Sequence, residues 1–194
     1  MKRSLIFIGM AVAAVTVAQA NTAGLRHGQT SVTLSEGFIN AMESLNVDVR
    51  AVGLGKLAAS GGKITATFPI SDGQIDLKTA KAEILHSGGL QLKAGNTVVI
   101  LNNYAIDTTG ATPALTGIVR ADGTLVGRIK LFDLQLPKGL SLPLKAPADG
   151  NFRLSGVGVT LSSEAANALN GVFKVQAFKQ GFEIGHAQVS SKVQ

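Results

Sequence analysis

Cysteine and tryptophan are both absent from the 194-residue chain, and Tyr104 is its single tyrosine. Without cysteine there is no disulfide framework, no thiolate metal site and no cysteine nucleophile. With so few tyrosine and tryptophan rings, we expect no stacking platform for nucleic-acid bases. The chain also lacks H-E-x-x-H, G-x-S-x-G and P-loop motifs, and its carboxylates are scattered singly. We therefore predict that the protein is not an enzyme and has no catalytic residues.

The long apolar run of the chain lies at the N-terminus. Two basic residues precede an apolar stretch from Leu5 to Val17, and an Ala-Gln-Ala motif follows at 18–20. These are the three parts of a secretory signal peptide. The stretch is shorter than the roughly 20 residues that a membrane-spanning helix needs. We therefore expect residues 1–20 to be removed, leaving residues 21–194 without a transmembrane span in the periplasm, the cell envelope or the medium.

The chain is basic, with 18 lysines and arginines against 12 carboxylates and a formal net charge of +6 at pH 7. The basic residues are scattered and nowhere form a run of three. Such a charge favours solubility, and the alternative is that it attracts an anionic polymer of the cell envelope. We predict no nucleic-acid partner.

Most of the chain shows the period-two alternation of β-strands. In the segment 63–70, Ile64, Ala66, Phe68 and Ile70 fall on one face, which is typical of a half-buried strand. Similar runs lie at 47–52, 82–86, 97–106, 114–121, 124–136, 152–161, 172–178 and 182–189.

Turn-forming pairs separate these runs. Asp-Gly occurs at Asp72-Gly73, Asp122-Gly123 and Asp149-Gly150, and glycine pairs add further turns. Glycine adopts positive φ without steric cost and aspartate tolerates it, so these pairs predict tight hairpins. Strands at this spacing predict one all-β domain over residues 21–194, an antiparallel sandwich or barrel.

Two segments interrupt the strand pattern, at 32–47 and 159–175, and each predicts a short helix that follows a strand end. Capping-box spacing makes Thr33 the predicted N-cap of the first helix, and Ser162 or Ser163 caps the second. Both helices are too short to be stable alone, so we expect them to pack on the sheet. Their similar sequences reflect either an internal duplication or two barrel ends closed by the same chemistry.

His86 and Tyr104 are the candidate ligand-binding residues. His86 ends the strand predicted at 82–86, on the face of Ile84, which places it at the rim of the sandwich or barrel. A side chain there either meets a ligand or only hydrogen-bonds the turn backbone. Tyr104 shares its parity with Val98, so we expect it to face the core with its hydroxyl at an edge. The histidine spacing supports no metal site.

The stretch His86-Ser87-Gly88-Gly89-Leu90 resembles the H-x-G-x-L stretch of HtaA-type domains, which are secreted haem-uptake domains of actinobacterial surface proteins. The Phe68-Pro69 pair and the helical segment at 35–45 are similar to that family as well. The resemblance implies haem capture, in which a tyrosinate from the upstream segment ligates the iron and His86 hydrogen-bonds that tyrosine. Residues 31–50 contain no tyrosine, and the aromatic residue there, Phe38, has no oxygen to offer.

We therefore predict a secreted, non-enzymatic, HtaA-like binding or structural module of the cell envelope, without a resident cofactor. One alternative is a haem-binding protein in which Tyr104 and His86 form the site. Another alternative is a carrier that holds an apolar ligand in a cavity inside its sheets.

Overall fold

The computed structural model describes residues 22–145 and 147–193, so the predicted signal peptide lies outside the described residues. The described part contains eleven strands and two helices. In chain order these are β1 (Thr22–Leu34), α1 (Glu36–Ser44), β2 (Asp48–Val52), β3 (Lys56–Ser60), β4 (Lys63–Asp76), β5 (Ala82–His86), β6 (Gly89–Ala94), β7 (Thr97–Asp107), β8 (Ala114–Ala121), β9 (Thr124–Gln135), β10 (Asn151–Leu161), α2 (Ser163–Phe173) and β11 (Glu183–Val193).

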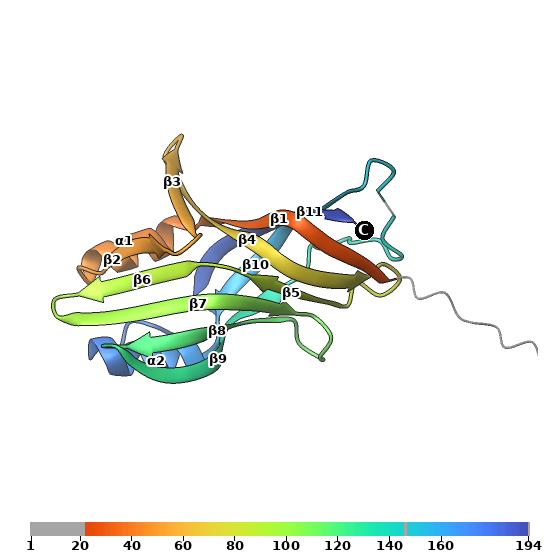
Figure 1. Ribbon diagram of the computed structural model, residues 1–194. Coiled ribbons are helices and arrows are strands. Elements are labelled where there is room, and N and C mark those ends of the chain that lie inside the picture. Colours follow the sequence, from red (N-terminus) through yellow and green to blue (C-terminus); the bar gives the residue numbers. More distant parts are fainter. Residues whose placement is uncertain (1–21, 146, 194) are drawn as a thin grey trace, which may run out of the picture.

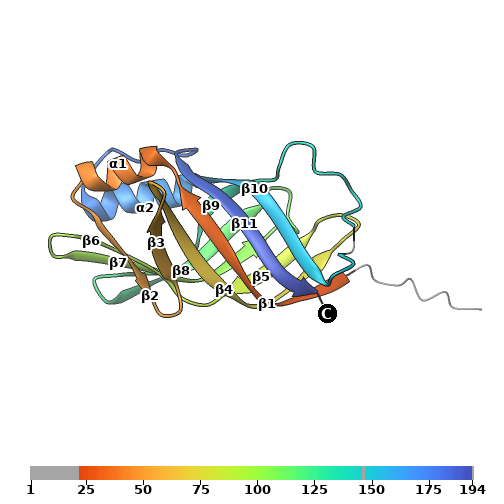
Figure 2. The same cartoon turned by 90° about the horizontal axis from the view of Figure 1, so that it is seen from above.

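Eight antiparallel strands close into a barrel. Their order is β1, β4, β5, β7, β8, β9, β10 and β11, and β11 pairs with β1 to complete the circle. Strand β6 pairs with β7 and carries β2 on its other edge, while β3 pairs with β4. Figures 1 and 2 show both helices over one end of this barrel. The predicted all-β class is confirmed, and between the two predicted architectures the barrel is the one found.

Apolar side chains of alternate residues fill the barrel. On β4, Ala66, Phe68 and Ile70 are buried as their parity predicts, while Thr67 and Pro69 between them are half-exposed. Burial of this kind stabilises a barrel by roughly 25 cal/mol per Å² of apolar surface removed from water. Neither described helix is long and apolar enough to cross a membrane.

Several of the predicted local structures are wrong. Asp149-Gly150 does not close a tight hairpin, because β9 ends at Gln135 and a long loop leads to β10 at Asn151. Asp72-Gly73 is not a hairpin turn, because it lies inside β4 where the register against β5 shifts after Ile70. Aspartate and glycine suit such a β-bulge as well as they suit a turn. The strand predicted at 172–178 is absent, since α2 continues to Phe173 and the residues after it form no strand. The Asp122-Gly123 hairpin, in contrast, is confirmed between β8 and β9.

A serine anchors each helix to a neighbouring strand. The N-cap of α1 is Ser35 and not Thr33: its Oγ accepts a hydrogen bond from the Phe38 amide at 3.1 Å and donates to the Glu183 carbonyl at 2.9 Å. Thr33 is still paired in β1, and the helix begins only after that strand ends. Because the strands before α1 and α2 flank β11 on its two sides, both helices cover the same end of the barrel.

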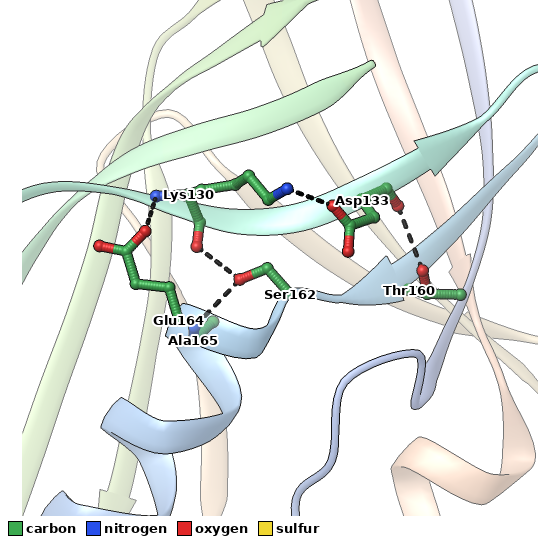
Figure 3. A network of polar contacts seen from close by, with 6 residues as sticks. All are labelled: Lys130, Asp133, Thr160, Ser162, Glu164 and Ala165. Atoms are coloured by element: carbon green, nitrogen blue, oxygen red, sulfur yellow. Dashed lines mark hydrogen bonds and ion pairs between the residues drawn. The ribbon is translucent and has the colours of Figure 1, made fainter. Parts of the chain in front are cut away.

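Ser162 has the same role at the start of α2 (Figure 3). Its Oγ accepts from the Ala165 amide at 3.0 Å and donates to the Lys130 carbonyl of β9 at 2.7 Å. The Glu164 carboxylate in turn accepts from the Lys130 amide at 3.2 Å. The ammonium of Lys130 forms an ion pair with Asp133 of the same strand, so the start of α2 and this part of β9 share one polar network.

We expect Ser162→Ala to lower the free energy of unfolding by about 2 kcal/mol, because it removes a helix cap and leaves the half-buried Lys130 carbonyl without its donor. The exposed neighbour Ser163 is the control, and Ser163→Ala should change stability by less than about 0.5 kcal/mol. Urea unfolding followed by circular dichroism measures both. Equal effects of the two substitutions would show that Ser162 is not the anchor of α2.

Candidate functional site

An apolar cavity of about 90 Å³ lies inside the barrel beneath the two helices. Phe38 of α1 and Ala165, Ala168 and Leu169 of α2 form part of its wall, and strands from around the barrel form the rest. Apart from Thr30, His86 and Tyr104, every side chain that lines the cavity is apolar. Thus the structure brings both predicted site residues to one cavity and adds Thr30, which no sequence pattern had marked.

His86 lies in the barrel interior and not at a rim. Its side chain is only 4% exposed, and its Nε2 lies 2.7 Å from the Thr30 hydroxyl of β1. The prediction that His86 lies at the rim is wrong, because the barrel wall does not end where β5 ends. Strand β7 pairs with β6 along its first half and with β5 along its second, so the wall continues past His86. The shared face of Ile84 and His86 is as predicted.

Burial makes His86 a neutral imidazole. Loss of hydration lowers its pKa from 6.5 to about 4, while the nearby backbone of Tyr104 and of Ile84 acts more weakly in the opposite direction. A neutral ring has one N–H and one lone pair. Nε2 shares a hydrogen bond with the Thr30 hydroxyl, but Nδ1 has no hydrogen-bond partner among the described residues. A buried polar atom without a partner is costly, and it offers a bond to a polar group of a ligand in this cavity.

Tyr104 reaches the cavity through a bulge in β7. Asn103 has φ +50° and the pairing with β8 shifts between Asn102 and Ala105, so the buried parity changes from Leu101 to Tyr104. Tyr104 therefore does not share a strand face with Val98 as expected, although its side chain does face the core. Its ring packs edge-to-face on Phe68 with 4.9 Å between the centroids.

The Tyr104 hydroxyl already has a partner inside the core. It donates to the Leu101 carbonyl at 2.9 Å, and burial raises its pKa well above 10. The phenol is therefore protonated at neutral pH, and it is not at an edge as expected. Gly117 of β8 provides the space for the ring, since a Cβ there would lie 3.0 Å from Tyr104 and 2.5 Å from Leu131.

A surface groove adjoins the cavity. It has a volume of about 360 Å³ and lies between α1, β2 and β3. Leu34 and Phe38 line both the groove and the cavity, so these two side chains separate them. In the part of the chain that the structure describes, no group of three histidine or carboxylate side chains is placed to hold a metal ion.

The sequence matches no protein-family model and no curated protein. Solved structures match in fold. The C-terminal domain of HtaA from Corynebacterium glutamicum has a TM-score of 0.62 and 17% identity, covering 89% of this chain and 99% of that domain. The chain has the HtaA-type fold. The N-terminal domain of HtaA matches with a TM-score of 0.58 and 13% identity, over 88% of this chain and 99% of that domain.

Another HtaA-type structure that matches is the heme binding protein HtaB from Corynebacterium glutamicum. Its TM-score is 0.56 at 10% identity, and the match covers 89% of this chain and 95% of HtaB. At these identities the likeness concerns the fold, and it confirms the fold that the H-x-G-x-L resemblance implied. The glycine of that motif, Gly88, has φ +82° and packs against the Gly55 backbone of the turn between β2 and β3.

Proposed function

We propose that this chain is a non-enzymatic binding protein that holds an apolar ligand at the helix-covered end of its barrel. The observation that carries the proposal is the cavity, whose lining is apolar except for three buried polar side chains. The free Nδ1 of His86 supplies one polar contact in that apolar site. Pockets of this composition, with few polar groups that fix orientation, are typical of small-molecule sites.

The volume of the cavity limits what can enter without movement. An engineered cavity of about 150 Å³ in another protein holds one benzene, so about 90 Å³ takes a smaller group. A larger ligand has to displace Phe38, which lies on a helix of nine residues and separates the cavity from the groove beside it. Movement of this side chain joins the two spaces and gives an elongated apolar site.

Haem is the second candidate ligand, because HtaB, a heme binding protein, has the same fold. The residues as they stand do not fit haem with Tyr104 as its axial donor. The phenol is protonated and bonded to Leu101, and the cavity is smaller than an engineered cavity that holds a single benzene. The free nitrogen of His86 is the donor that remains, and it would need the cavity and the groove to be joined.

We also infer that the protein acts outside the cytoplasm, as one domain of residues 21–194. The N-terminal signal-peptide pattern supports this inference. The intact mass of protein recovered from an exporting cell tests it, and retention of Met1 would contradict it.

We expect one molecule of the apolar fluorophore N-phenyl-1-naphthylamine to displace Phe38 and to bind saturably in the joined cavity and groove. Ala168→Leu should weaken this binding by about tenfold or more, because the larger side chain fills the cavity. Asn167 is the control position, since it lies beside Ala168 on α2, is exposed and does not line the cavity. Asn167→Leu introduces the same side chain outside the cavity and should leave the affinity unchanged. Absence of saturable binding to the wild type would overturn the proposed function.

Haemin titration distinguishes the second candidate. If haem is the ligand, the wild type shifts the Soret band of haemin, and His86→Ala abolishes that shift. Tyr104→Phe should leave it intact, because the phenol already donates to Leu101. Fluorophore binding without a Soret shift supports an apolar ligand other than haem.

A further inference from the structure

The outward face of β6, β7, β8 and β9 combines cations with apolar side chains. Cross-strand pairing places Ile100, Arg120 and Leu125 in one row, and Ile118 and Arg128 in the next. The residues between them on these strands, such as Val99 and Val119, are buried inside the barrel. We call this surface the basic sheet face, and its members are Lys93, Ile100, Ile118, Arg120, Leu125 and Arg128.

The cations Lys93, Arg120 and Arg128 of this face form no ion pair within the part of the chain that the structure describes. Among the described residues, no carboxylate lies within ion-pair distance of Lys93, Arg120 or Arg128. Arg128 is held against the sheet instead, because its guanidinium donates to the Thr116 hydroxyl at 3.1 Å and to the Asn103 carbonyl at 2.9 Å. The charge of Arg128 is therefore fixed on the outer face of the sheet.

The carboxylates around the face have other partners. Asp48 of β2 lies directly across from Lys93, but it forms an ion pair with Arg50 of its own strand. Asp122 lies in the turn between β8 and β9, where its Oδ1 accepts the Val98 amide at 2.7 Å. Asp133 forms an ion pair with Lys130. The remaining potential of the sheet is positive, which favours an anionic partner.

The hairpin that joins β8 and β9 adds two apolar side chains to this edge. Leu125 is 55% exposed and Val126 is 58% exposed, beside Arg120. This tip lies at the same end of the barrel as the two helices (Figure 1). Aliphatic side chains gain free energy by entering the headgroup region of a bilayer, while adjacent cations are attracted by anionic headgroups. A soluble anionic polymer would bind through the cations alone and would gain nothing from the exposed aliphatic side chains.

We propose that the basic sheet face docks on an anionic lipid surface, with Leu125 and Val126 entering the headgroup region. The proposal rests on this surface alone and does not depend on the cavity or on its ligand. Docking brings the helix-covered end of the barrel next to the bilayer, where apolar molecules are concentrated.

Co-sedimentation with vesicles tests the docking. We expect the protein to bind vesicles of phosphatidylcholine with phosphatidylglycerol and to bind pure phosphatidylcholine vesicles far more weakly, with binding reduced by salt. Lys93→Gln with Arg120→Gln should weaken binding by about 25-fold, since each cation near a charged membrane contributes about fivefold. Leu125→Ser with Val126→Ser should weaken it without changing the salt dependence.

Control variants separate docking from general charge and exposure. Lys192 and Leu142 are exposed and lie outside this face, so Lys192→Gln and Leu142→Ser should leave vesicle binding within about twofold of the wild type. Circular dichroism confirms that each variant is folded. Equal binding to both vesicle types, or equal losses in face and control variants, would overturn the proposal. Dextran sulfate is the polymer probe: binding to it with no loss in the Leu125 and Val126 variant on vesicles would favour a polymer partner and reject the lipid one.

Discussion

Acidification from pH 7 to pH 4 is expected to remove about 3 kcal/mol of the free energy of unfolding through His86 alone. Burial lowers the pKa of His86 in the folded protein to about 4, whereas the unfolded chain has the ordinary value of 6.5. Between these two values the unfolded state binds a proton that the folded state does not. The stability that depends on neutral His86 is therefore complete above about pH 6.5 and is lost as the pH falls toward 4, by about 1.4 kcal/mol per pH unit.

His86→Gln isolates this contribution, because the amide retains a group that can bond the Thr30 hydroxyl but does not titrate. Carboxylates also lose charge in this pH range, but they do so equally in the wild type and in the variant. Subtracting the two stability curves from urea unfolding therefore leaves the imidazole term. Curves that run parallel from pH 7 to pH 4 would falsify the assignment of a buried, neutral His86.

The burial of His86 also changes the expected role of this residue. A histidine at a rim would lose only one ordinary hydrogen bond on substitution, at about 1 kcal/mol. A histidine that is 4% exposed and bonded to a buried hydroxyl leaves both a void and an unpaired Thr30 when it is removed. Thr30 is itself only 3% exposed, so its hydroxyl has no access to bulk water as a replacement partner.

Alternation and turn chemistry were sufficient to predict strands, hairpins and an all-β domain, because both depend on neighbours in the sequence. Barrel closure was not predictable, since it depends on the pairing of β1 with β11 and of β5 with β7, which are not consecutive in the chain. The bulge at Asn103 reverses which residues of β7 face inward, and no local pattern marks it. The strand at β1 was missed for most of its length, and its Thr30 with it.

The candidate site shows the same division between local and distant information. His86 was selected by its place beside a glycine pair, which is a local feature. Its burial follows from β6 continuing the wall after β5, and its partner comes from a strand 56 residues away in sequence. The sequence alone showed that no tyrosine lies in the segment upstream of His86 at 31–50. The structure adds that the Tyr104 hydroxyl is bonded to the Leu101 carbonyl. The apolar lining of the cavity then favours an apolar ligand, with or without a metal centre.

Gly88→Ala is expected to lower the free energy of unfolding by about 4 kcal/mol, from two separate costs. The first is conformational: Gly88 has φ +82°, a left-handed geometry that costs a residue with a Cβ about 1–2 kcal/mol. The second is steric, because the added Cβ would lie 2.2 Å from the Gly55 amide nitrogen and 2.9 Å from the Leu54 carbonyl carbon. Both are backbone atoms, so the turn between β2 and β3 has to move.

Two other glycines separate these costs. Gly95 has φ +56° but no atom within 4 Å of its added Cβ, so Gly95→Ala should cost only the conformational term of about 1–2 kcal/mol. Gly171 lies on α2 with open space around it, and Gly171→Ala should stabilise the protein by about 0.5–1 kcal/mol. Chemical unfolding of the three variants measures the series. If Gly88→Ala costs no more than Gly95→Ala, the close approach of Gly88 to Gly55 does not stabilise this fold. If Gly88→Ala is as costly as expected, the glycine that follows His86 in the motif is needed to seat the turn at 53–55 against the end of β5 that carries His86.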